Sequence, residues 1–229
     1  MQKQERRIIG LLGPRGAGKD EVGNHLVKRH GFAKIAFADA IRSEAAAHWN
    51  INVLNFLDRR QKELPTRWLA VQACRDSRFV DWFNANNQGD LLALYRHRSP
   101  RWVLQQWGSY RIATGSPDYW IERVRERLDR MPRRKNIVIT DVRTKEEVAF
   151  ISSLTDDAHF DYIKPGYAGY REGGTATHAR TDSPLWDDPG AVALMRNGLW
   201  TTFNDAGLDT LAHCIDVLLK EIDGRISRP

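Results

Sequence analysis

Short apolar runs alternate with longer amphipathic stretches along the chain, a pattern typical of strands that alternate with helices. Residues 136–140 read Asn-Ile-Val-Ile-Thr, with three successive β-branched apolar residues, and predict a buried strand. The other expected strands are residues 8–12, 33–37, 158–163 and 200–203, and the expected helices are 21–30, 38–48, 100–113, 117–130, 145–153 and 208–222. The crossovers are long enough for right-handed βαβ units. We therefore expect an α/β fold: a mainly parallel sheet with helices on both faces.

Two stretches interrupt this alternation. Residues 50–98 mix aromatic and charged positions, and we interpret them as two or three helices inserted between the second and third strands, with a loop at 84–89. Residues 164–190 are rich in glycine, aromatic and basic residues and are long for a simple connection, so we expect a mobile lid or acceptor-side loop there. An ordinary exposed loop is the alternative. Both segments are expected within one domain of residues 1–229.

The amino-acid composition indicates a globular protein without membrane-spanning segments. Hydrophobic residues make up 41% and charged residues 28% of the 229 positions, as in globular proteins. No apolar run approaches the ~20 residues that span a bilayer, so we expect no membrane association. Cys74 and Cys214 are far apart and lack metal-site spacing, which indicates buried or idle thiols in a reducing cytoplasm. A cleaved signal peptide is not expected, since cleavage would destroy the glycine-rich motif at residues 13–19, which is described below.

The charge balance adds a possible partner. Formal net charge is +6 and the sequence pI is about 9.5, which favours a polyanion such as DNA. Solvated basic faces with no such partner explain the same charge. The eight tryptophans have two readings as well, stacking on bases or packing in a core.

The stretch that carries most chemistry follows the first expected strand. Residues 13–19, Gly-Pro-Arg-Gly-Ala-Gly-Lys, fit the phosphate-loop pattern G-x-x-x-x-G-K between a strand and a helix. Backbone N–H groups in such a loop surround a phosphate, and Lys19 would reach the β- and γ-phosphates of ATP. A glycine-rich turn that binds nothing is the alternative. The residues expected to bind ATP are Gly13, Arg15, Gly16, Ala17, Gly18, Lys19 and Asp20.

Acidic residues supply the expected metal site. The phosphate-loop motif normally ends in Ser or Thr, whose hydroxyl binds Mg²⁺, but this chain has Asp20 there. A carboxylate can hold Mg²⁺ directly or through water. Asp141 directly follows the buried strand and is expected to bind the same ion. Arg143, beside Asp141, is a candidate for stabilising the charge on the transferred phosphoryl group.

Asp39 distinguishes two chemistries. It comes directly after the second expected strand, where it can cap a helix and also lie on the same sheet edge as the phosphate loop. A hydroxyl acceptor benefits from a carboxylate base, whereas a phosphate acceptor needs none. We therefore expect Lys19, Asp39, Asp141 and Arg143 to be catalytic, although Asp39 could instead bind the sugar or base of a nucleotide.

Several segments together resemble one family. They are the Gly-Lys-Asp ending of the loop, Phe-Ala-Asp at 37–39, Leu-Gln-Gln-Trp-Gly at 104–108 with Arg111, Asp-Tyr-Trp at 118–120, Asp-Val-Arg at 141–143 and Asn-Asp-Ala-Gly at 204–207. In this order they resemble phage-type deoxynucleoside monophosphate kinases. The resemblance implies a P-loop NTPase fold, ATP and Mg²⁺ as cofactors, and the cytoplasm of a bacterial host. It implies an acceptor site containing Asp39, Arg42, Gln105, Gln106, Trp107, Arg111, Tyr119, Trp120 and Arg180.

The acceptor itself stays open. Family members carry a His-x-Ser-Glu-like segment in the later loop, and residues 178–183 of this chain match it only in part. A related phage group is similar in sequence but phosphorylates 5-hydroxymethyluracil within DNA, a step in thymidine hypermodification. We hold these two acceptors, the free nucleotide and the base in DNA, as nearly equal. A nucleic-acid-binding protein with a degenerate phosphate loop is the alternative outside enzymes, and a homodimer also stays open.

Overall fold

A computed structural model of the chain describes residues 6–58, 60–166, 185 and 188–226. The expected α/β fold class is confirmed, because the described strands form a parallel sheet with helices on both faces. The chain divides into two compact units, one formed by Met1–Ala36 with Arg127–Pro229 and the other by Phe37–Glu126. Each unit is described by itself.

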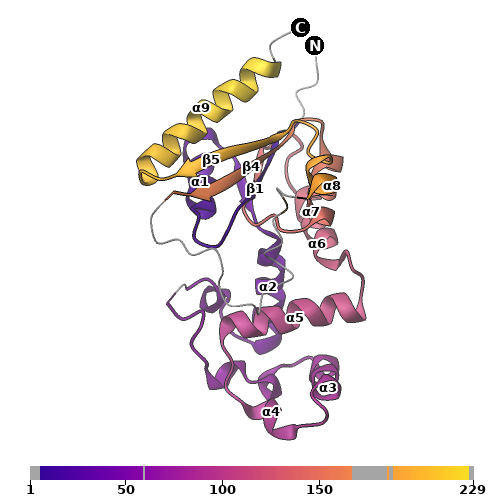
Figure 1. The fold of residues 1–229 in the computed structure, drawn as a ribbon. Coiled ribbons are helices and arrows are strands. Elements are labelled where there is room, and N and C mark those ends of the chain that lie inside the picture. The colour runs from indigo at the N-terminus through magenta and orange to yellow at the C-terminus, as the bar shows by residue number, and fades with distance from the viewer. Residues whose placement is uncertain (1–5, 59, 167–184, 186–187, 227–229) are drawn as a thin grey trace. The chain divides into compact units, whose positions relative to one another are not determined.

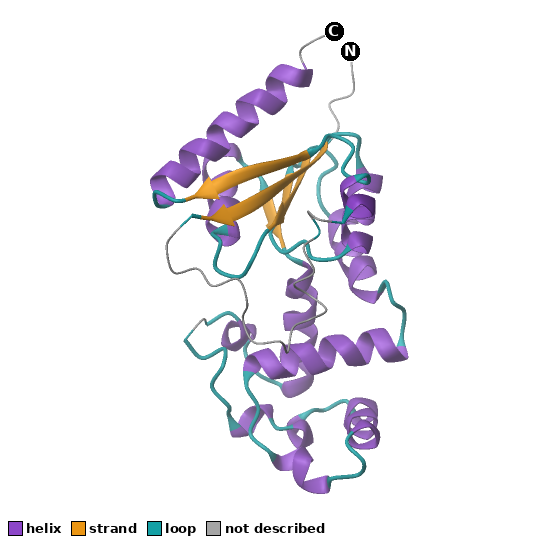
Figure 2. Ribbon diagram, viewed as in Figure 1, coloured by secondary structure: helices purple, strands orange, loops and turns teal. Residues whose placement is uncertain are grey.

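The first unit is built on five described strands in the order β2-β3-β1-β4-β5, all parallel (Figure 2). β1 (Ile8–Leu12) lies in the centre, between β3 (Ile137–Ile139) and β4 (Ala158–Pro165). β2 (Ala33–Ile35) and β5 (Leu199–Asn204) form the two edges. Every residue of β1 and β3 is buried, as their apolar sequences predict.

Helices cover both faces of this sheet (Figure 1). α1 (Lys19–His30) and α9 (Leu208–Ile226) lie on one face, and their apolar side chains form one core with alternate residues of the strands. α7 (Lys145–Leu154) and the short α8 (Pro189–Val192) lie on the other face. The helices that follow the adjacent strands β1 and β3 thus run to opposite faces, which marks the carboxyl ends of these strands as the switch point of the sheet.

The second unit is helical and has an aromatic core. Its helices are α2 (Phe37–Trp49), α3 (Ser77–Asn86), α4 (Leu91–Tyr95), α5 (Pro100–Thr114) and most of α6 (Tyr119–Asp129), with three 3₁₀ turns at Val53–Phe56, Arg67–Leu69 and Val71–Ala73. The Trp107 ring lies 5.8 Å from Trp49, 5.4 Å from Phe79 and 5.3 Å from Tyr110, centroid to centroid. Three of the tryptophans, Trp49, Trp107 and Trp120, therefore serve this core.

Several boundaries differ by a few residues from the sequence prediction, and two of these differences follow. The second strand ends at Ile35 and not at residue 37, because Phe37 opens α2 and buries its ring. Asp39 consequently lies in the first turn of α2, where its charge complements the helix dipole, and not at a cap. The loop expected at 84–89 begins late, since α3 continues to Asn86.

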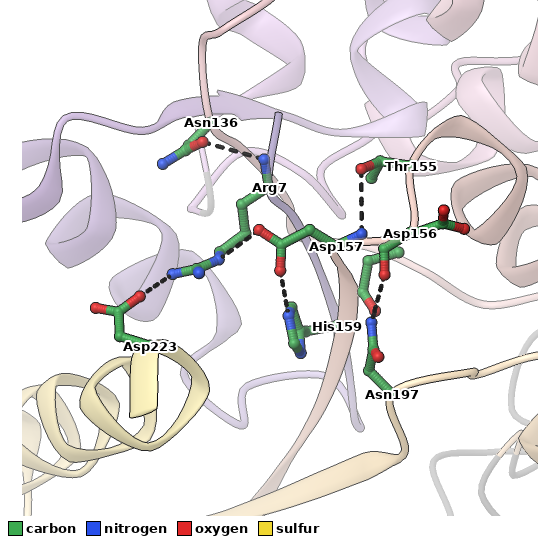
Figure 3. A network of polar contacts seen from close by, with 9 residues as sticks. Arg7, Asn136, Thr155, Asp156, Asp157, His159, Asn197 and Asp223 are labelled. Atoms are coloured by element: carbon green, nitrogen blue, oxygen red, sulfur yellow. Dashed lines mark hydrogen bonds and ion pairs between the residues drawn. The ribbon is translucent and has the colours of Figure 1, made fainter. Parts of the chain in front are cut away.

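A polar network holds the amino ends of the strands together (Figure 3). Arg7 pairs with Asp157 at 3.0 Å and with Asp223 of α9 at 2.7 Å. Asp157 also receives a 2.7 Å hydrogen bond from His159. Burial opposes the charge of Asp157, but His159 and Arg7 outweigh it and hold the pKa of this carboxyl below its usual value. This network lies at the edge opposite the phosphate loop and serves the fold.

Within the described ranges, no helix is both long and apolar enough to cross a membrane.

Candidate functional site

The loop between β1 and α1 has a backbone that only glycine tolerates at key points. Gly13, Gly16 and Gly18 have φ of 124°, 81° and 104°. A Cβ on Gly13 would lie 2.4 Å from the carbonyl oxygen of Ile163 in β4, and one on Gly18 would lie 2.8 Å from the side chain of Asn204. Glycines with positive φ are typical of loops whose backbone N–H groups bind phosphate.

Lys19 is the first residue of α1 and folds back over the loop. Its ammonium donates hydrogen bonds to the carbonyl oxygens of Gly13, at 2.5 Å, and Pro14, at 2.7 Å. The positive charge therefore lies across the loop at the N-terminus of a twelve-residue helix, whose dipole also favours an anion. Ala17 is fully buried and Arg15 is exposed, so the loop is anchored at one point and open at another.

Asn204, the last residue of the edge strand β5, holds the phosphate loop in place. The sequence alone did not identify it as a site residue. Its side-chain amide donates a 2.9 Å hydrogen bond to the carbonyl oxygen of Ala17. The backbone carbonyl of Asn204 accepts a 2.9 Å hydrogen bond from the backbone N–H of Gly166, and this bond holds the ends of β4 and β5 together. Its position could have identified it. Asn204 is a side-chain amide at the end of the last expected strand, and it belongs to the segment 204–207, one of those that resemble the kinase family.

Asp141 lies at the switch point beside the end of β1. The Thr140 N–H donates to the carbonyl oxygen of Ile35 in β2 at 3.1 Å, and the Val142 N–H donates to that of Leu11 in β1 at 3.3 Å. After β3 ends, the chain therefore stays hydrogen-bonded between these two strands. This places Asp141 at the same carboxyl edge as the phosphate loop. Asp20 is in the first turn of α1, with its carboxylate 3.5 Å from the Lys34 ammonium.

Arg143 and Glu147 lie close to Asp141 and influence the charge around it. Arg143 donates its backbone N–H to the Glu147 carboxylate at 2.6 Å, and Thr144 completes a capping box with Glu147 at the start of α7. Burial and the charge of Asp141 raise the pKa of Glu147 to about 8. Both causes favour the uncharged form of Glu147, and a divalent cation held by Asp141 would offset the repulsion and favour the charged form.

The second unit contains a polar cluster centred on Glu44 of α2, which the sequence reasoning missed. One carboxylate oxygen accepts from the Tyr119 hydroxyl at 2.7 Å, and the other accepts from Trp107 Nε1 at 3.2 Å. The Arg111 guanidinium pairs with Glu44 at 3.1 Å and donates to the Tyr119 hydroxyl. Burial and the bond to Glu44 raise the pKa of Tyr119. The cluster joins three expected acceptor residues through a residue that only the fold brings to them.

The remaining expected acceptor residues are placed as follows. Asp39 and Arg42 pair one helical turn apart on α2, with 2.9 Å between Nη1 and Oδ1. Gln105 is exposed and Gln106 half-buried on α5. Trp107 and Trp120 are buried in the core, so their part in any site is to position neighbours. Arg180 and most of the expected lid lie outside the described residues.

Comparisons with known proteins add limited information. No protein-family model and no curated protein matches the chain. Solved structures similar to it include a gluconokinase from Sinorhizobium meliloti 1021, at 13% identity and a TM-score of 0.42 over 99% of this chain and 100% of that one. A dephospho-CoA kinase from Campylobacter jejuni matches at 13% identity and 0.40, over 95% and 97%. A sugar kinase from Janibacter sp. HTCC2649 matches at 13% and 0.37, over 94% and 95%. Because these similarities are low, the site rests on this chain's own geometry.

Proposed function

We propose that this protein is a P-loop kinase that transfers the γ-phosphoryl group of ATP to a deoxynucleotide. The observation that carries the proposal is the phosphate loop: three glycines with positive φ, Lys19 across the loop, and Asp141 at the tip of the adjacent strand. Phosphoryl transfer needs mainly positioning and charge stabilisation, which these groups provide.

On the donor side, the loop N–H groups bind the phosphates, and the Lys19 ammonium exchanges its two carbonyl partners for β- and γ-phosphate oxygens. Asp141 and Asp20 offer carboxylate oxygens, the ligands that Mg²⁺ prefers. When bound, Mg²⁺ would neutralise part of the negative charge of the phosphates. Arg143 and Arg15 supply further positive charge near the transferred group.

On the acceptor side, two deoxynucleotides are supported nearly equally: a free deoxynucleoside monophosphate, or the hydroxymethyl group of 5-hydroxymethyluracil in DNA. Gln105, Gln106, Arg42 and Arg180 would bind the acceptor, and Glu44 would hold Arg111 and Tyr119 in place for it. The acceptor oxygen forms a bond to the γ-phosphorus as the bond to the β-phosphate oxygen breaks and ADP leaves. With a hydroxyl acceptor, the released proton passes to the Asp39 carboxylate.

The deciding experiment offers ATP labelled at the γ-phosphate together with deoxynucleoside monophosphates and 5-hydroxymethyluracil-containing DNA. We expect label in one of these two pools. Lys19→Ala should abolish the transfer, whereas Lys28→Ala, which removes the same charge from an exposed position of the same helix, should not. Transfer that survives in Lys19→Ala would disprove the donor site. Absence of transfer to either pool, with DNA binding retained, would favour the non-catalytic alternative.

Asp39→Asn then separates the two acceptors. If the acceptor is a hydroxyl, losing the base should lower the rate by roughly 10²–10⁴-fold. If the acceptor is already an anionic phosphate, the rate should change little through proton transfer. As an independent check, binding to DNA should weaken steeply with salt if DNA is the substrate.

A further inference from the structure

Two histidines of α1 and one aspartate of α9 meet on the face of the first unit where these helices pack. His25 Nε2 lies 2.6 Å and His30 Nε2 lies 2.7 Å from the same carboxylate oxygen of Asp216. The ligand atoms of the three residues all lie within 4.8 Å of one another. The kinase chemistry uses none of them, since α1 carries the phosphate loop at its other end.

We propose that His25, His30 and Asp216 form a binding site for a zinc-type divalent transition-metal ion that clamps the end of α1 to α9. Two imidazoles and one carboxylate suit zinc, whereas Mg²⁺ and Ca²⁺ prefer oxygen ligands alone. With three protein ligands, a water completes a tetrahedral site.

The geometry requires only a small adjustment. Metal–ligand bonds of ~2.0–2.1 Å in a tetrahedron put neighbouring ligand atoms about 3.3 Å apart. Asp216 therefore moves back by less than about 1 Å from its two hydrogen bonds, and the two nitrogens, already within 4.8 Å of each other, close on the ion. All three side chains are partly exposed, so they have room to move and the ion can enter from solvent.

The backbone supports this convergence. His30 is the last residue of α1, and Gly31 follows with φ of 68°, which ends the helix. Leu26 of α1 shares one apolar core with Leu211 and Ile215 of α9, and this core keeps the two helices together with or without metal.

The protonation chemistry is consistent with metal binding. Hydrogen bonds from His25 and then His30 lower the pKa of Asp216, so the carboxylate is charged and ready to bind a cation. Each histidine would bind the ion through Nε2 as a neutral ring with its proton on Nδ1, so a neutral ring that carries its proton on Nε2 must first change to the other tautomer.

Calorimetric titration of the metal-free, nucleotide-free full chain with zinc chloride tests the proposal. We expect one zinc per chain and a zinc-dependent rise in the thermal unfolding midpoint. His25→Gln and His30→Gln should each weaken zinc binding by more than about 10-fold. Mutating a residue that only hydrogen-bonds to a metal ligand already lowers metal affinity by about this factor. His213→Gln, an exposed histidine of α9 outside the cluster, should bind like the wild type.

His30 lies at the exposed end of its helix, so its variant decides the question if His25→Gln fails to fold. Wild-type protein that takes up no zinc overturns the proposal, and so does zinc binding that both histidine variants retain unchanged. Neither result bears on phosphoryl transfer, which the labelling experiment tests separately.

Discussion

Replacing Gly13 by alanine tests the backbone on which the phosphate loop depends. At φ of 124° an L-residue is strained, which costs about 1–3 kcal/mol. The new methyl group would lie 2.4 Å from the Ile163 carbonyl, a backbone atom of β4 that cannot turn away, and relieving such overlap costs a further ~1–3 kcal/mol. We therefore expect Gly13→Ala to destabilise the first unit by about 4 kcal/mol and to weaken ATP binding.

Gly31→Ala is the matched control. Gly31 also has positive φ, 68°, but a Cβ there meets nothing within 4 Å. Only the conformational cost of about 1–2 kcal/mol remains, so this variant should lose less stability and bind ATP normally. Urea unfolding and calorimetric ATP titration of both variants measure the difference. Equal losses of stability in the two variants, or normal ATP affinity in Gly13→Ala, would refute the claim that contact with β4 fixes the loop.

Three further predictions concern other contacts. Asn204→Ala removes the hydrogen bond to Ala17 and should raise the KM for ATP by about 3- to 10-fold, the equivalent of one hydrogen bond, while the KM for the acceptor stays constant. Glu44→Gln should show the opposite split in steady-state kinetics, with the acceptor KM raised about 10-fold and the ATP KM unchanged, because the charge that holds the cluster is lost. Burial raises the pKa of Asp161 to about 6, above its value of about 3.9 in the unfolded chain, so its contribution to stability is lost as pH rises through this interval. Asp161→Asn should therefore be more stable than the wild type by about 1–3 kcal/mol at pH 7 but not at pH 3, as urea unfolding would reveal; an equal difference at both pH values would contradict this.

The parts of the molecule that follow from local sequence were predictable. The strand, glycine turn and helix of the phosphate loop are consecutive, and the apolar run before Asp141 indicates a buried strand without knowledge of its neighbours. The start of α2 was misplaced because Phe37 suits a strand or a buried helix position equally well, and only the folded chain decides between them.

The parts that depend on distant contacts could not be predicted. Glu44 looks like an ordinary helix residue until the fold brings Arg111 and Tyr119 to it, some 70 positions further along the chain. Asn204 reaches the phosphate loop across 187 residues of sequence. Trp107 was expected in the acceptor site because of the motif that contains it, but its ring is buried in the core and offers no face for stacking.

The division of the chain has an engineering consequence. The second unit is one uninterrupted segment, Phe37–Glu126, inserted between two strands of the first, and it holds Asp39, Arg42, Glu44 and the glutamines of α5. If these residues bind the acceptor as proposed, exchanging this one segment of the gene would replace the expected acceptor residues other than Arg180 and would leave the phosphate loop unchanged. A chimera that receives the corresponding segment of a kinase with a known acceptor should inherit that acceptor's selectivity.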